Sequence, residues 1–169
     1  MWECACYLVE EAKPRLSFRM FRLLTADGTP GLCITRIYPD IAREKYPLRG
    51  VRVVWLADAP EEDSLRPMGI VNLSKTIEDF IEQHPEGCAI LLDGIEFLIL
   101  RNGFDPVLSF VAHLNEFVMR RKAIVLLPVS PATLERKELA RLERDLEVAD
   151  VAAWRAELDA REWSRRLGG

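Results

Sequence analysis

The chain has 169 residues, of which 49% are hydrophobic and 30% charged, so it has the length and composition of one globular domain. Its formal net charge of -4 argues against a nucleic-acid-binding protein, which would present a strongly basic face. No uninterrupted apolar run approaches the roughly 20 residues that a membrane-spanning helix needs, and the N-terminus lacks the pattern of a secretory signal. We therefore expect a cytoplasmic protein without membrane insertion.

Five short apolar runs predict the strands. Unbroken apolar runs of this length are typical of strands that are buried on both faces in a parallel sheet. Residues 59–68 hold two prolines and three acids, which predicts an exposed loop after the third strand. The predicted strands are Cys4–Val9, Gly31–Ile37, Val51–Leu56, Cys88–Leu92 and Ala123–Leu127.

Apolar residues at helical spacing predict a helix after each of the first four strands. The alternation of strand and helix predicts an α/β fold in three layers, with a mainly parallel five-stranded sheet, helices on both faces and a C-terminal helical extension. The four predicted helices span residues 13–26, 39–45, 72–84 and 104–121.

The chain from Leu134 onward has a helical pattern almost to its end, and we divide it into an α/β domain at 1–147 and an extension at 148–169. One continuous helix would be about 45–50 Å long, which exceeds the width of such a domain. The helix therefore either breaks near Asp150 or leaves the body and packs on a partner, as in a homodimer. A second helix folded back on the sheet is the alternative. The candidate interface residues are Val151, Trp154, Leu158 and Trp163.

The loop after the first predicted strand bears on nucleotide binding. A phosphate-binding loop at this position uses glycines, backbone N–H groups and a lysine to hold the phosphates. Residues 10–15 read EEAKPR and contain no glycine. They include two carboxylates, which repel phosphate, and a proline, which lacks a backbone N–H donor. The sequence thus excludes a conventional phosphate loop.

Acidic residues follow or end several predicted strands, and parallel strands bring their carboxyl ends to one edge of the sheet. Such oxygen ligands suit Mg²⁺ or Ca²⁺, although Arg36 could instead bridge one or two carboxylates while the others remain solvated. We otherwise expect no cofactor, and no catalytic constellation is apparent in the sequence. The candidate site residues at this acidic rim are Glu10, Glu11, Arg36, Asp58, Asp93 and Glu96.

Five blocks of sequence, YLVEEAKP, PGLCITR, VVWLAD, LLDGIEFLILRNGF and KELARLERDLE, occur in this order between Tyr7 and Glu147. In these blocks the chain resembles an archaeal and bacterial family called domain of unknown function 835. Members are often joined to sensory modules such as PAS domains or to membrane segments. Their layout is similar to a RecA-like ATPase core, like that of the circadian-clock ATPases, without its phosphate loop.

The resemblance implies that LLDGIEFL stands where such a core has its Mg²⁺-binding strand, with Asp93 as the matching residue. It also implies a strand order in which the fourth predicted strand lies between the second and the fifth, and the first lies beside the fifth. A flavodoxin-like order is the alternative.

Two functions from different classes follow. The first is a non-catalytic signalling or protein-interaction module that binds a protein partner or a second copy of itself. The second is a metal- or nucleotide-dependent sensor or enzyme that uses the acidic rim.

Overall fold

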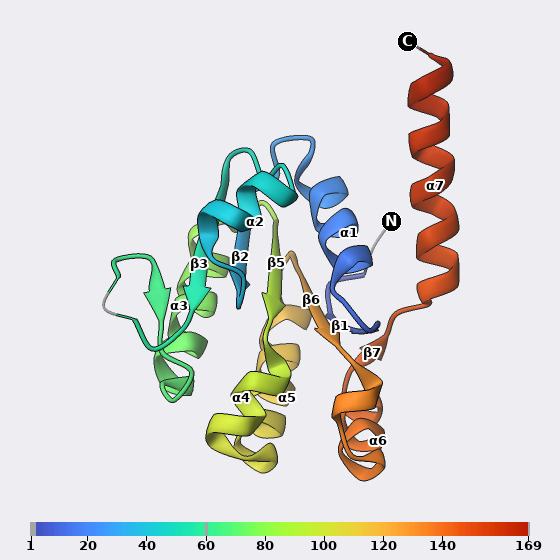
Figure 1. The fold of residues 1–169 in the computed structure, drawn as a ribbon. Helices are drawn as coiled ribbons and strands as arrows, with labels where there is room; N and C mark the ends of the chain where they lie inside the picture. The colour runs from blue at the N-terminus through green and yellow to red at the C-terminus, as the bar shows by residue number, and fades with distance from the viewer. Residues whose placement is uncertain (1–2, 60, 169) are drawn as a thin grey trace.

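The computed structural model describes residues 3–59 and 61–168, whose strands form a single sheet with parallel pairing between all neighbours. The strand order is β4-β3-β2-β5-β6-β1-β7 (Figure 1). The strands are β1 Cys6–Glu10, β2 Gly31–Thr35, β3 Val51–Leu56, β4 Ser64–Leu65, β5 Cys88–Asp93, β6 Ala123–Val129 and β7 Glu147–Val148.

The predicted number of five strands is wrong, because the sheet has seven. The two extra strands are two-residue edge strands, β4 in the predicted loop and β7 in the predicted C-terminal helix. Backbone hydrogen bonds hold these strands to the sheet, such as the one from the Trp55 N–H to the Asp63 carbonyl at 2.8 Å. The sequence did not predict them because a strand of two residues is too short to show a periodic pattern. The five longer strands are confirmed. In the observed order β5 lies between β2 and β6, and β1 lies beside β6, as in the RecA-like layout.

Helices cover both faces of this sheet, which confirms the three-layer arrangement. Apolar cluster membership puts α1, α2 and α7 on one face and α3, α4, α5 and α6 on the other. None of the described helices is both long and apolar enough to cross a membrane. The helices are α1 Arg15–Thr25, α2 Pro39–Lys45, α3 Ile70–Gln83, α4 Ile95–Asn102, α5 Phe104–Met119, α6 Arg136–Asp145 and α7 Val151–Leu167, with a 3-10 turn at Pro131–Thr133.

The sheet separates two apolar clusters because successive strand residues point to opposite faces. Along β5, Ile90 belongs to the cluster under α3 to α6, whereas Leu91 belongs to the cluster under α1, α2 and α7. Both side chains are fully buried. This double burial explains why the strands read as unbroken apolar runs in the sequence.

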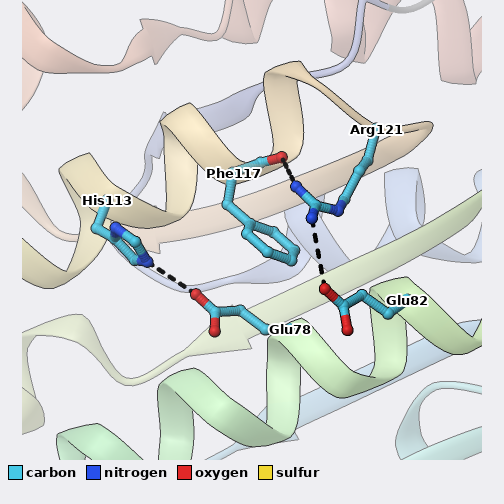
Figure 2. A network of polar contacts seen from close by, with 5 residues as sticks. All are labelled: Glu78, Glu82, His113, Phe117 and Arg121. Carbon is cyan, nitrogen blue, oxygen red and sulfur yellow. Dashed lines mark hydrogen bonds and ion pairs between the residues drawn. The ribbon is translucent and has the colours of Figure 1, made fainter.

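Polar contacts at the outer surface join α3 to α5 (Figure 2). His113 Nε2 lies 2.9 Å from Glu78 Oε1, and an Arg121 nitrogen lies 3.4 Å from Glu82 Oε1. The Arg121 guanidinium also lies 3.5 Å from the centre of the Phe117 ring. These ion pairs are exposed, and Arg121 follows the end of α5, so we expect them to contribute little to the stability of the fold.

The C-terminal segment is two helices, because the chain leaves α6, forms β7 and starts again as α7. Asp150 caps α7, since its carboxylate accepts a hydrogen bond from the Ala153 N–H at 3.0 Å. The first half of α7 packs on the body through Trp154 and Leu158, each 5% exposed. Residues 159–168 are all exposed, and α7 extends past the body (Figure 1).

Candidate functional site

The turn between β1 and α1 brings Glu11 back onto the first turn of α1. Its two carboxylate oxygens accept hydrogen bonds from the Leu16 N–H at 2.8 Å and the Ser17 N–H at 2.9 Å. The Ser17 hydroxyl donates a third hydrogen bond at 2.5 Å. The first N–H groups of a helix have no partner within the helix and favour a negative charge. Glu11 therefore fills the anion-binding position at the start of α1.

The carboxylate of Asp93 lies at the carboxyl end of β5, in register with Thr35 at the end of β2. The fully buried Thr35 hydroxyl donates a hydrogen bond to Asp93 Oδ2 at 2.9 Å. Gly94 follows with φ +149°, and a Cβ at this position would lie 2.7 Å from a methyl carbon of Leu56. Glycine therefore lets α4 start directly after Asp93.

Burial raises the pKa of Asp93 to about 6, because the charged form loses solvation. The hydrogen bond from Thr35 acts in the opposite direction and lowers this pKa. The nearby carboxylates of Glu96 and Glu11 raise it, and the Arg36 guanidinium lowers it. Glu11, Glu96 and Arg36 are thus each close enough to Asp93 to influence the pKa of its carboxyl.

Arg36 does not bridge the carboxylates. Its guanidinium donates a hydrogen bond to the Leu56 carbonyl at 2.6 Å and lies 3.6 Å from the centre of the Phe97 ring, a cation–π geometry. Glu96, in the first turn of α4, instead accepts a hydrogen bond at 2.6 Å from the Ser130 N–H, just after β6. Arg36 and Glu96 thus connect the loops that border Asp93.

The other two residues of the predicted rim, Asp58 and Glu10, have different neighbours. Asp58 pairs with Arg101, in the last turn of α4, at 3.2 Å. Glu10, the last residue of β1, lies near Glu143 of α6, whereas Glu11 is bonded to the start of α1. Burial and the nearby carboxyl of Glu143 raise the pKa of Glu10. The six predicted residues therefore form a smaller cluster of Glu11, Asp93, Glu96 and Arg36, with two outliers.

The predicted interface residues lie in different environments. Trp154 and Leu158 are buried within the chain, and Val151 is half-buried against the same cluster. Trp163 is 62% exposed. The apolar stripe that suggested a partner is therefore largely covered by α1 and β1, and Trp163 is the predicted anchor that remains accessible.

Sequence reasoning missed Thr35, Ser17 and Phe97, which hold Asp93, Glu11 and Arg36. Each of these residues reaches its partner through the register of two strands or the conformation of a loop. Neither feature can be read from a local sequence pattern. The described part of the chain contains no group of three or more His, Cys, Asp or Glu side chains placed to hold a metal ion. The cluster therefore contains the half-buried carboxyl of Asp93 and, near it, an anion-binding helix start that the Glu11 carboxylate already fills.

Comparisons with known proteins agree with this description. Residues 10–146 match the family model described as "Protein of unknown function (DUF835)". No curated protein matches the chain. The chain is similar in structure to a KaiC-like protein from the hyperthermophilic archaeon Pyrococcus horikoshii OT3, with TM-score 0.55 and 17% identity. The match covers 79% of this chain and 66% of that chain, so this chain spans just under two thirds of its length. At this identity the likeness shows the RecA-like fold alone.

A weaker likeness joins the chain to a protein in the structure of Drosophila ORC bound to DNA. Its TM-score is 0.42 at 11% identity, over 88% of this chain and 80% of that one.

Proposed function

The chain belongs to the DUF835 family, whose description names no activity, and we propose from the geometry of its own site that it is a non-catalytic module. We propose further that this module mediates protein interaction in signalling. In this proposal the RecA-like layers serve as a scaffold that contacts a protein partner or a second copy of the chain. The module does not turn over nucleotide.

One observation carries the proposal, namely the position of the Glu11 carboxylate. In a strand–loop–helix unit that binds nucleotide, phosphate oxygens accept hydrogen bonds from the N–H groups at the start of the helix. Here Glu11 accepts those bonds from Leu16 and Ser17. A bound phosphate would have to displace a carboxylate that is tethered within the same turn, and the neighbouring acids would repel it.

A variant that empties this position tests the proposal. Glu11→Ala leaves the N–H groups of Leu16 and Ser17 without their acceptor, which we expect to lower the free energy of unfolding by about 1–2 kcal/mol. Phosphate should restore part of this loss in the variant, relative to chloride at equal ionic strength, and should have no specific effect on the wild type. Chemical unfolding in the two salts measures both effects.

The matched control is Asp150→Ala, which removes the carboxylate that caps α7. Phosphate should restore less of the lost stability here, because Asp150 accepts one N–H at an exposed position, whereas Glu11 accepts two N–H groups and a hydroxyl. Specific stabilisation of the wild type by phosphate would contradict the proposal, since the anion position would then be open.

The acidic rim supports a second candidate function, a metal- or nucleotide-dependent sensor or enzyme. The observation in its favour is Asp93, a half-buried carboxyl at the carboxyl end of β5 with a raised pKa. This candidate predicts that Mg²⁺ or Ca²⁺ raises the melting temperature and that Asp93→Asn abolishes the rise. A melting temperature indifferent to both ions would leave it without support.

A further inference from the structure

Arginines line a cavity between three segments, which are α1, residues 158–165 of α7 and residues 47–49 before β3. The cavity has a volume of about 410 Å³. Its charged lining is strongly one-sided, because it contains a single acid, Glu162. The arginines are Arg19, Arg22, Arg49, Arg161 and Arg165.

Two of these arginines are already neutralised within the chain. Arg19 contacts Asp159 at 2.8 Å and Glu162 at 3.0 Å, and Arg161 contacts Glu157 at 2.9 Å. Among the described residues no carboxylate lies within ion-pair distance of Arg22, Arg49 or Arg165. We call these three side chains and the cavity beside them the arginine groove.

The opposite kind of surface lies in the loop between β3 and β4. Asp58 and Asp63 in this loop have basic partners, at 3.2 Å and 3.9 Å respectively. Glu61 and Glu62 are exposed, and no ion pair within the described chain involves them. We call these two residues the acidic loop.

Exposed apolar side chains lie near the acidic loop. Met68 and Val71 follow β4 and are 63% and 81% exposed. Trp163 and Leu167 are 62% and 71% exposed on α7, but they lie on the opposite face of this helix from Leu158, Glu162 and Arg165, which line the cavity. The acidic loop therefore has apolar area beside its unpaired charge, the composition of a protein contact, and the arginine groove contributes the complementary charge.

The two surfaces lie at different ends of the molecule. The arginine groove includes Arg49, just before the amino end of β3, whereas the acidic loop follows the carboxyl end of the same strand. In Figure 1 strand β4, which follows the acidic loop, and helix α7 lie at opposite edges of the sheet. One copy of the chain therefore cannot bring its own loop into its own groove.

We propose that the arginine groove of one copy receives the acidic loop of a second copy, in a head-to-tail contact. Such a contact joins unlike surfaces and builds a ring or an open chain. The proposal rests on the self-association included in the proposed function and names the surfaces that carry it. Because exposed charges are screened by salt, the association is stronger at low ionic strength.

Two neutral variants test the contact by sedimentation velocity at 50–500 µM protein and low salt. The groove variant carries Arg22→Gln, Arg49→Gln and Arg165→Gln, and the loop variant carries Glu61→Gln and Glu62→Gln. We expect each to weaken self-association about tenfold, as loss of several exposed ion pairs does. Mixed together, they should form a one-to-one dimer and no larger species, since the groove variant keeps its loop and the loop variant keeps its groove.

The matched control is Arg120→Gln, Arg136→Gln and Arg144→Gln, which removes the same charge from exposed positions outside the groove. It should associate like the wild type. Equal weakening by the control, or no dimer in the mixture, would overturn the head-to-tail contact while leaving self-association in place. A wild type that is monomeric throughout this range would overturn both the contact and self-association.

Discussion

Glu11 and Asp93 are neighbouring carboxylates that the chain treats differently. Glu11 accepts three hydrogen bonds from the first turn of α1, whereas the hydrogen bond found for Asp93 comes from the Thr35 hydroxyl. Burial dominates at Asp93 and raises its pKa to about 6 from an ordinary value of 3.8. A raised pKa means that the folded protein binds a proton more tightly than the unfolded chain.

This shift predicts how Asp93→Asn changes stability with pH. The favourable contribution of the neutral carboxyl is complete below about pH 4 and is lost as pH rises through about 6. Asparagine stays neutral, so the variant should match the wild type near pH 4 and gain on it up to about pH 7, by a margin that approaches about 3 kcal/mol. Urea unfolding at both pH values measures the margin.

The control for this prediction is Asp79→Asn, at an exposed position of α3. It should show no comparable pH-dependent gain. A margin for Asp93→Asn that is the same at pH 4 and pH 7 would contradict the raised pKa, because the carboxyl would then already be ionised across this range in the folded protein.

At the scale of the elements, α7 has two parts with different roles. Trp154 contacts the ring of Tyr7 edge-on, with centroids 5.6 Å apart, and is buried with Leu158. Trp163, two and a half turns further on, is 62% exposed. The first half of α7 therefore completes the core over β1 and α1, and the second half is accessible to a partner.

A pair of substitutions separates these roles. Trp154→Ala should lower the free energy of unfolding by about 3 kcal/mol, because it leaves a cavity between α7 and the sheet. Trp163→Ala should change it by less than about 0.5 kcal/mol. Chemical unfolding of the two variants measures both values, and similar losses would mean that the second half of α7 also packs on the body.

The elements also show what the sequence could and could not predict. The apolar run ending in Asp93 identified β5 and the edge where ligands bind in such sheets. Thr35 was missed because its place beside Asp93 depends on the register of β2 against β5, which are far apart in the sequence. Glu11 was expected to repel phosphate, but the turn that brings its carboxylate onto α1 leaves no pattern in the residues.

The same limit applied to α7. The spacing of Val151, Trp154 and Leu158 predicted an apolar stripe, but spacing alone does not say whether the chain itself or a partner covers it. β7 settles this, because its two-residue pairing with β1 turns the chain so that α7 begins beside α1. Neither a two-residue strand nor the resulting direction of the helix can be read from local periodicity.

At the scale of the whole molecule, a RecA-like arrangement of layers is combined with an anion position that the chain fills itself. The parallel sheet places the start of α1, the end of β5 and the loop after β6 at one edge, as a nucleotide-binding protein of this layout requires. Glu11 occupies the phosphate position there, and charged surfaces of opposite sign lie elsewhere on the molecule. These two features are the basis on which we propose contact rather than turnover.

A titration of the wild-type protein with Mg²⁺-ATP, followed by calorimetry, tests this central claim most directly. We predict no saturable binding heat at millimolar nucleotide, because the phosphates would have to displace Glu11 from the N–H groups of Leu16 and Ser17. Saturable binding of Mg²⁺-ATP to the wild type, accompanied by a rise in its melting temperature, would contradict the account.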